Sequence, residues 1–413
     1  MRILCRNIDL DIKAPPSKSV YHRELIVNYI LGARGGYLDD SADDNDDIRA
    51  TRSCLRALAD KEAETVVLNC NESGSTLRFM IPVALAIKSE ANRTLVFKTK
   101  GRLIDRPVGE LSECLRPFGV VITRDKENNE IRVTGNIEPG EYVIDGSVSS
   151  QYISGLLMAL ASFGRESSVS VTGGIASVHY IELTVAVLSK YGIDVVREGD
   201  TFRVPALTEK TVPDGSFEVE GDWSNGAFLL CLGSLIHGGS IKVSGLNMDS
   251  VQGDKAILRF LKLANISHVI EGNAVFVQDS TINPVMEKIE IECGDIPDIV
   301  PYMAVTGAFR AKKTVLNGIR RLRIKESDRA AAITQMLTKM GGNVTLEEDT
   351  ITIEYIDKVP DGIALTSSGD HRMAMAAVLC SAAAGKEIEL DDINCLDKSF
   401  PEFRKVLLKE MTV

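Results

Sequence analysis

Six segments of the chain begin with small or polar residues and continue directly into an apolar stretch of helical length. They are PPSKSVYHRELIVNYIL, NESGSTLRFMIPVALAI, GSVSSQYISGLLMALAS, GDWSNGAFLLCLGSLI, GDIPDIVPYMAVTGAF and GDHRMAMAAVLCSAAA. Each pattern predicts a helix that starts at its small or polar residues. The starts lie near Ser17, Ser73, Ser147, Asp222, Asp295 and Asp370, and the last five follow at nearly constant intervals. This periodicity predicts a repeated architecture.

The order of elements also recurs within each repeat. The first helix ends at a glycine or a polar turn, and a β-branched strand such as SVSVTG, SIKVSG or TVLNG follows. A second helix comes next, in YIELTVAVLSKYG, GDKAILRFLKLAN and ESDRAAAITQMLTKMGG, and then a pair of strands such as NVTLEED and ITIEY. The pattern predicts an α/β fold of six β-α-β-α-β-β repeats, three per domain. The polar stretch 205–222 is the best linker.

The small residues before each helix have two interpretations. Taken singly, each is an ordinary N-cap. Taken together, six helix starts present unsatisfied N–H groups and the positive ends of their dipoles. If these starts converge on one cleft, they form an anion site.

Length and composition restrict the possible functions. A chain of 413 residues is longer than one hydrophobic core usually supports, which favours two domains. A mean hydropathy of +0.03 is typical of a soluble globular protein. The net charge of -11 and the pI near 5.2 argue against nucleic acid and against anionic membranes as partners. An anionic ligand would therefore need a local concentration of positive charge.

The chain also lacks targeting and metal-binding patterns. The N-terminal segment has no signal-peptide core, and no apolar run is long enough to span a bilayer. Eight scattered cysteines without a CxxC pair predict reduced thiols in a cytoplasmic protein. The histidines form no metal-ligand cluster, so we expect no metal. The run DDSADDNDD at 39–47 lacks the glycine and terminal glutamate of an EF-hand loop and is expected to be a solvated acidic turn.

Positive charge is concentrated in RRLRIKESDRAA at 320–331. Ordinary surface charge does not explain this run in an acidic chain. The cations are Arg320, Arg321, Arg323, Lys325 and Arg329, and the carboxylates Glu326 and Asp328 lie among them.

Five motifs in order, PPSKSVYHR, GSVSSQY, KESDR, GDHRMAM and KSFPEF, resemble the EPSP synthase (3-phosphoshikimate 1-carboxyvinyltransferase) family from about Ala14 to Phe403. The resemblance implies a two-domain enolpyruvyl-transferase fold with an active site in the interdomain cleft. One domain would comprise residues 1–14 and 223–413, and the other residues 15–222. The implied reaction joins phosphoenolpyruvate to the 5-hydroxyl of shikimate 3-phosphate and releases phosphate. No cofactor is implied, and a monomer is expected.

The resemblance also assigns roles to individual residues. For shikimate 3-phosphate these are Lys18, Ser19, Arg23, Ser149, Ser150, Gln151, Ser177, Tyr180, Asp298, Arg321 and Lys325. For phosphoenolpyruvate they are Lys18, Gly74, Arg106, Gln151, Arg329, Arg372 and Lys398. Asp298 would accept the hydroxyl proton, and Glu326 and Lys18 would perform the remaining proton transfers. Asp328 and Asp370 are expected to be structural partners of arginines.

Three further expectations concern individual positions. A Cβ at position 74 would crowd the phosphoenolpyruvate ligand, which explains glycine there. Glu72 and Arg321 replace asparagines of better-known family members, and Glu72 is expected to pair with Arg78 or another cation. The only tryptophan, Trp223, lies where the chain is expected to cross between domains, so its solvent contact should change on domain closure.

Two alternatives remain from the sequence. A UDP-N-acetylglucosamine enolpyruvyl transferase would carry a reactive cysteine before an Arg-Pro, and KTKGRLIDRP has none. A non-catalytic anion-binding repeat protein would have lost at least one of Lys18, Asp298, Glu326 and Lys398, and all four are present.

Overall fold

The chain forms two compact units in the computed structural model, which describes residues 1–41, 44–60, 63–87, 93–207, 212–278 and 285–412. Unit 1 comprises Met1–Ser17 and Glu220–Val413, and unit 2 comprises Lys18–Val219. These boundaries lie close to the predicted ones, after residues 14 and 222. Part of the predicted linker, 208–211, is outside the described residues.

Unit 2 contains two four-stranded sheets, ordered β3-β4-β6-β5 and β7-β8-β10-β9. In each sheet the first two strands are parallel and the remaining pairs are antiparallel. The elements are α1 (Lys18–Ile30), α2 (Asp46–Leu58), β3 (Thr65–Asn71), α3 (Gly74–Ile87), β4 (Thr94–Thr99), α4 (Gly109–Leu115), β5 (Val121–Asp125), β6 (Glu130–Thr134), β7 (Glu141–Asp145), α5 (Ser150–Leu160), β8 (Ser167–Thr172), α6 (Val178–Lys190), β9 (Val196–Glu198) and β10 (Thr201–Val204), with 3₁₀ turns at Gly101–Asp105 and Arg116–Phe118.

Unit 1 contains two sheets of the same pattern, β14-β15-β17-β16 and β2-β11-β13-β12, and a three-stranded sheet, β18-β19-β1. Its elements are β1 (Arg2–Ile3), β2 (Asp9–Lys13), α7 (Trp223–Leu235), β11 (Ser240–Ser244), α8 (Ile257–Leu263), β12 (His268–Glu271), β13 (Ala274–Gln278), β14 (Met286–Glu292), α9 (Val300–Ala308), β15 (Ala311–Asn317), α10 (Arg329–Lys339), β16 (Val344–Leu346), β17 (Thr350–Glu354), β18 (Ile363–Leu365), α11 (His371–Ala384), β19 (Ile388–Leu390) and α12 (Pro401–Glu410), with 3₁₀ turns at Gly253–Ala256, Arg320–Ile324 and Asn394–Lys398.

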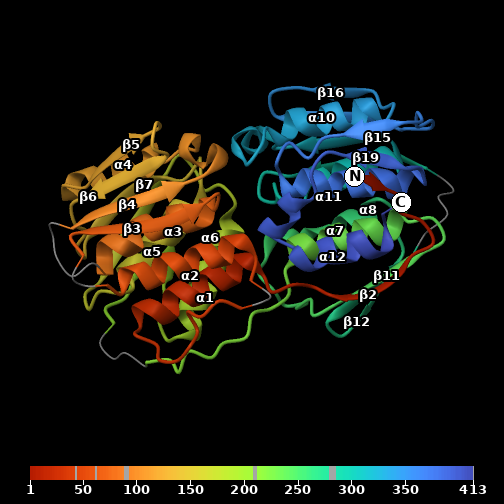
Figure 1. Cartoon of the computed structure of the whole chain (residues 1–413). Coiled ribbons are helices and arrows are strands. Elements are labelled where there is room, and N and C mark those ends of the chain that lie inside the picture. The colour runs from red at the N-terminus through yellow and green to blue at the C-terminus, as the bar shows by residue number, and fades with distance from the viewer. Residues whose placement is uncertain (42–43, 61–62, 88–92, 208–211, 279–284, 413) are drawn as a thin grey trace. The chain divides into compact units, whose positions relative to one another are not determined.

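The six predicted repeats are not equally self-contained. The full β-α-β-α-β-β order is present in residues 65–134, 141–204 and 286–354. The sheet that follows α7 takes its parallel first strand from β2, and Figure 1 shows β2 (red) beside β11 (green). The last sheet takes its third strand from β1, which pairs antiparallel with β19. Strands of the N-terminal segment therefore complete two sheets of unit 1.

Three inner helices form the centre of each unit. They are α1, α3 and α5 in unit 2 and α7, α9 and α11 in unit 1, and within each set all three pack against one another. These are the six helices predicted from the apolar segments, and that prediction is confirmed. Every residue of α7 is buried, as expected for a sequence that is apolar on all faces.

Trp223 belongs to the core of unit 1 rather than to a mobile surface. Its side chain is 0% exposed, and its indole Nε1 donates to the Asn247 carbonyl at 3.0 Å. The expectation that its solvent contact changes is therefore wrong. The reason is that the first residue of α7 already faces the core, although the chain enters the unit only three residues earlier, at Glu220.

The predicted solvated acidic turn at 39–47 is also wrong in its second half. Asp44, Asn45 and Asp47 are buried, while residues 42–43 lie outside the described residues. Asp44 pairs with Arg52 at 2.7 Å, and Asn45 caps α2 by accepting from the Ile48 N–H at 3.0 Å. Charge density alone did not reveal that these polar groups have buried partners.

One side chain, Gln252, holds both segments at which the chain leaves unit 1. Its Oε1 accepts from Ser17 Oγ at 2.9 Å and from the Trp223 N–H at 3.1 Å. Its Nε2 donates to Glu220 Oε1 at 2.7 Å and to the Gly221 carbonyl at 2.9 Å. All the hydrogen-bonding capacity of this buried amide is therefore used.

We predict that Gln252→Leu lowers the free energy of unfolding of unit 1 by about 3 kcal/mol, because it leaves several buried polar groups without a partner. Trp223 emission reports the unfolding of this unit in a urea titration. Gln335→Leu, at an exposed position of α10, is the matched control and should change little. Equal stability of the two variants would show that the Gln252 contacts contribute nothing.

Candidate active site

The inner helices of unit 2 start without acidic residues. The first turns of α1, α3 and α5 contain none, and serines act as neutral acceptors at two of these starts. Ser73 Oγ accepts from the Thr76 N–H at 3.2 Å, and Ser149 Oγ accepts from the Gln151 N–H at 3.3 Å. The positive ends of these helix dipoles are therefore not neutralised by their caps.

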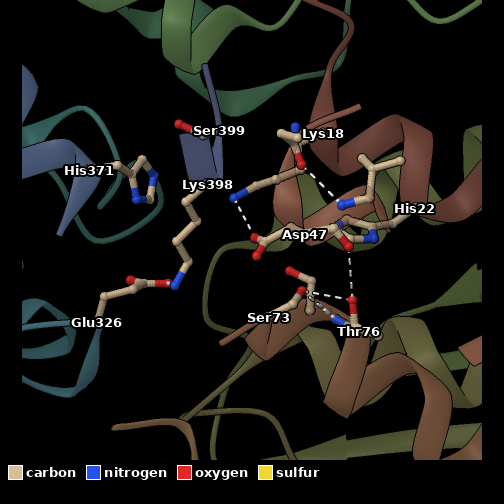
Figure 2. A network of polar contacts seen from close by, with 12 residues as sticks. Lys18, His22, Asp47, Ser73, Thr76, Glu326, His371, Lys398 and Ser399 are labelled. Atoms are coloured by element: carbon tan, nitrogen blue, oxygen red, sulfur yellow. Dashed lines mark hydrogen bonds and ion pairs between the residues drawn. The ribbon is translucent and has the colours of Figure 1, made fainter. Parts of the chain in front are cut away.

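Lys18, at the start of α1, pairs with a carboxylate that the sequence did not single out. Its Nζ lies 2.8 Å from Asp47 Oδ2, and Asp47 is only 5% exposed in the first turn of α2 (Figure 2). The Asp47 carbonyl accepts in turn from Thr76 Oγ1 at 3.3 Å. The sequence analysis did not single out Asp47 because it is one of several acidic residues in a short run.

A neutral hydrogen-bonded chain lies behind this pair. His22 Nδ1 contacts Thr51 Oγ1 at 2.8 Å, and Thr51 contacts Thr76 Oγ1 at 2.7 Å. Thr76 Oγ1 donates to Ser73 Oγ at 2.7 Å. Burial lowers the pKa of His22 to about 3, so this histidine is uncharged at neutral pH. These hydrogen bonds link α1, α2 and α3 without adding charge.

Arg23 ties α1 to neighbouring helices through neutral oxygens. Its Nε donates to Thr184 Oγ1 at 2.7 Å, and its Nη1 donates to the Ser19 carbonyl at 2.5 Å. Its Nη2 donates to the Tyr180 carbonyl at 2.7 Å and to Ser154 Oγ at 3.2 Å. Burial lowers the pKa of Arg23 to about 9. These contacts describe a positioning role, and ligand binding by Arg23 stays a prediction.

Gln151 is held between α3 and α5. Its Oε1 accepts from Arg78 Nη1 at 2.8 Å, and its Nε2 donates to Ser75 Oγ at 2.8 Å. Arg78 also donates to the Pro107 carbonyl at 3.2 Å, beside Arg106 in sequence. Arg78 thus connects Gln151 to the segment that follows Arg106, a role that the sequence gave no reason to expect.

The structure gives a steric explanation for glycine at position 74. A Cβ at this position would overlap Arg106 Nη1 and would lie 2.8 Å from Arg106 Cζ. A side chain at position 74 would therefore crowd the guanidinium of Arg106, and crowding of a ligand stays a prediction. Glycine lets this cation lie directly over the start of α3.

The predicted phosphate cradle is assembled from two loops. The Ala176 N–H donates to the Gly146 carbonyl at 3.1 Å, which brings the segment before α6 beside the segment before α5. Ser177 is buried and adopts a left-handed φ of 52°, an uncommon conformation for a residue other than glycine. Ser149 and Ser150 are also buried.

Unit 1 carries a compact ionic cluster. Asp298 Oδ1 lies 3.2 Å from Lys325 Nζ and 2.8 Å from Arg329 Nη1. Arg329 also contacts Glu326 Oε2 at 3.0 Å and binds Asp370 through two bonds of 2.8 and 3.2 Å. Arg329 and Asp370 are buried, at 1% and 0% exposed, whereas the side chains of Asp298 and Glu326 are 23% and 17% exposed.

The five clustered cations therefore have different roles. Lys325 and Arg329 belong to the ionic cluster, and Arg321 Nη1 donates to the Gly294 carbonyl at 3.5 Å. Arg320 pairs with Glu348 at the surface, at 3.2 Å, and Arg323 donates to the Glu347 carbonyl at 2.9 Å.

The expected structural roles of the two other aspartates are confirmed. Asp370 caps α11 by accepting from the Arg372 N–H at 2.9 Å while it binds Arg329. Asp328 caps α10 through the Ala331 N–H at 3.0 Å and lies 4.0 Å from Arg323.

Electrostatics keep the cluster charged. Burial opposes ionisation of Asp298, yet Lys325, Arg329 and Arg372 hold the pKa of its carboxyl well below the usual range. Burial lowers the pKa of Lys325 to about 8, although Asp298 acts in the opposite direction. Burial also opposes the charge on Arg329, but its carboxylate partners raise its pKa. Asp298 is therefore an ionised carboxylate at neutral pH.

Two further cations lie in unit 1. Arg372 is 3% exposed, and its Nη1 donates to the Tyr302 hydroxyl at 3.0 Å. Lys398 Nζ lies 4.0 Å from Glu326 Oε1, and Figure 2 shows its side chain extending toward that carboxylate. Within the described residues, no three His, Cys, Asp or Glu side chains are grouped to hold a metal ion.

Comparison with known proteins decides the family. The family model described as EPSP synthase (3-phosphoshikimate 1-carboxyvinyltransferase) matches residues 5–407. The chain belongs to the EPSP synthase family. A protein named 3-phosphoshikimate 1-carboxyvinyltransferase from Clostridioides difficile is 30% identical, over 98% of this chain and 96% of its own length. One of the same name from Clostridium kluyveri is 31% identical, over 95% and 92%.

Solved structures agree on the fold. EPSP synthase from Acinetobacter baumannii has a TM-score of 0.72 and 21% identity, covering 100% of this chain and 98% of that one. The enolpyruvyl transferase NikO from Streptomyces tendae has a TM-score of 0.70 and 13% identity, covering 99% and 96%. The predicted enolpyruvyl-transferase fold is therefore confirmed.

Within this EPSP synthase family member, the residues expected from the resemblance fall into two groups. Unit 2 holds Lys18, Ser19, Arg23, Gly74, Arg106, Ser149, Ser150, Gln151, Ser177 and Tyr180, and unit 1 holds Asp298, Arg321, Lys325, Glu326, Arg329, Arg372 and Lys398. Direct contacts join Asp298, Lys325, Arg329 and Glu326 into one cluster. Asp47, Arg78 and Tyr302 contact residues of these groups and were not expected.

Proposed function

We propose that the chain transfers the enolpyruvyl group of phosphoenolpyruvate to the 5-hydroxyl of shikimate 3-phosphate and releases phosphate. The observation that carries this proposal is the pairing of the Asp298 carboxylate with Lys325 and Arg329, which keeps it ionised. Glu326 forms an ion pair with the same arginine. Such a site combines a base for a hydroxyl proton with cations for phosphate and carboxylate groups. Family membership supports the same reaction.

The proposed mechanism is an addition followed by an elimination. Asp298 accepts the proton of the 5-hydroxyl as that oxygen attacks C2 of phosphoenolpyruvate. A proton is added to C3, and the product is a tetrahedral ketal phosphate. Loss of a proton from C3 then re-forms the double bond as the C2–O bond to phosphate breaks. Glu326 and Lys18 are the proposed groups for the two proton transfers at C3.

We assign the ligand contacts as the resemblance implies. Serines 149, 150 and 177 would bind the phosphate of shikimate 3-phosphate, supported by the uncompensated helix starts of unit 2. Arg106, Arg329, Arg372 and Lys398 would bind phosphoenolpyruvate. Their guanidinium and ammonium groups match its carboxylate and phosphate.

We further propose that the chain acts as a monomer in the cytoplasm, without a cofactor, in chorismate and aromatic amino acid synthesis. The buried thiols support a reducing compartment, since seven of the eight cysteines are buried and all are free. No helix in the described part of the chain is long and apolar enough to cross a membrane.

A continuous assay of phosphate release tests this function. Release should require both phosphoenolpyruvate and shikimate 3-phosphate, and should persist in EDTA because arginines and lysines neutralise both anions. Replacement of shikimate 3-phosphate by UDP-N-acetylglucosamine should give no release. Turnover with the nucleotide sugar, or none with shikimate 3-phosphate, would overturn the proposal.

We predict that Glu326→Gln lowers kcat by about two orders of magnitude, because a general acid–base group contributes on that scale. Calorimetry should show nearly unchanged binding of shikimate 3-phosphate. Glu348→Gln, at an exposed ion pair with Arg320, is the control and should retain normal turnover. Normal kcat in the Glu326 variant would remove this carboxylate from the chemistry.

The lowered pKa of Lys325 predicts a pH dependence. Above a pH of about 8, Lys325 loses its proton and its attraction for the anionic substrate, so KM for shikimate 3-phosphate should rise. Below that pH the lysine is charged and KM should be level. Lys325→Arg keeps its charge at high pH and should move this rise upward. If the wild-type protein and the Lys325→Arg variant had the same pH profile, the rise in KM would be due to another group.

A further inference from the structure

Arg372 has unused hydrogen-bonding capacity inside the protein. It lies in the first turn of α11 and is 3% exposed. Its Nη1 donates to the Tyr302 hydroxyl, whereas its buried Nε has no hydrogen-bond partner among the described residues. A guanidinium carries five N–H donors, and buried donors normally have acceptors. An arginine in this state is prepared for an anionic ligand.

The two buried arginines of this cluster differ in what holds them. Arg329 is bound by the carboxylates of Asp298, Glu326 and Asp370, which together outweigh its charge. The acceptor that orients Arg372 is the oxygen of a neutral phenol. A neutral acceptor fixes the direction of a guanidinium without forming an ion pair with it.

Tyr302 is itself held firmly. It is 0% exposed in α9, and its ring centroid lies 5.6 Å from that of Phe228, at an angle of 54°. Its hydroxyl donates to Met375 Sδ at 3.0 Å, so the oxygen lone pairs are directed to the arginine. Burial raises the pKa of Tyr302, which therefore remains protonated at neutral pH.

We propose that Tyr302 is a positioning residue that orients Arg372, so that this arginine presents free N–H donors to the carboxylate or phosphate of phosphoenolpyruvate. The inference rests on the proposed function. It concerns binding of this one substrate, because Tyr302 contacts neither Asp298 nor Glu326 through a hydrogen bond that the structure describes.

Tyr302→Phe removes the acceptor and keeps the ring. We expect KM for phosphoenolpyruvate to rise about tenfold, because an oriented hydrogen bond to a charged group is lost. The kcat and the KM for shikimate 3-phosphate should change less than about threefold. The matched control is Tyr142→Phe, which removes an equally buried hydroxyl that donates to the Glu138 carbonyl at 2.6 Å. It should leave both KM values unchanged.

A double-mutant cycle tests whether the effect passes through Arg372. In an Arg372→Lys background, Tyr302→Phe should have little further effect on KM for phosphoenolpyruvate. Full additivity, an unchanged KM in Tyr302→Phe, or an equal rise in Tyr142→Phe would each overturn the inference. If wild-type protein shows no turnover, the proposed function fails instead, which is a different result.

A second variant covers the case in which Tyr302→Phe does not fold, as judged by thermal unfolding. Met375→Leu keeps the volume of the core and removes the acceptor of the phenolic hydrogen, so the hydroxyl is free to rotate away from Arg372. KM for phosphoenolpyruvate should then rise about threefold, with KM for shikimate 3-phosphate unchanged. An unaltered KM for phosphoenolpyruvate would contradict the positioning role.

Discussion

The inner helices begin inside the protein, and their first N–H groups must find acceptors there. The two units meet this requirement with different chemistry. In unit 2 the acceptors are serine hydroxyls, as at Ser73 and Ser149. In unit 1, α7 and α11 are capped by Asp222 and Asp370, which accept from the N–H groups of Asn225 and Arg372. This choice of cap determines the charge at the helix starts of each unit.

A serine cap leaves the positive end of a helix dipole available to an anion, whereas an aspartate cap reverses the sign. The aspartate caps of unit 1 therefore need buried cations to offset their charge. Arg329 fulfils part of this need by binding Asp370, and in doing so it brings Glu326 and Asp298 together. The unusual run of cations in an acidic chain follows from this arrangement. Of these cations, Lys325 and Arg329 belong to the ionic cluster. Arg320 and Arg323 bind partners at the surface.

The inner helices were predictable because a local pattern specifies them: a polar start followed by residues that are apolar on every face. The contacts of Asp47, Arg78 and Tyr302 were not, because each joins residues from different helices, and periodicity carries no information on which side chains meet. Trp223 shows a related limit. Its place at a chain crossing was read from the sequence, but its burial depends on how α7 packs.

The N-terminal strands were the largest departure from six equal repeats. β2 pairs with β11, and β1 pairs with β19, across more than two hundred intervening residues. No local signal records such a pairing. The family resemblance did imply that residues 1–14 belong to the other domain from the helix that follows them.

These two strands determine the order in which the units can be completed during translation. Unit 2 is one continuous segment, so all its partners have left the ribosome while the rest of unit 1 is still being made. Unit 1 has the opposite history, since β1 is made before unit 2 and its partner β19 is made after unit 2. Met1 even exchanges backbone hydrogen bonds of 2.8 Å with Leu390 in both directions. The nascent chain therefore carries an unpaired edge-forming segment until β11 and β19 have been made, and such a non-local pairing is of the kind that slows folding.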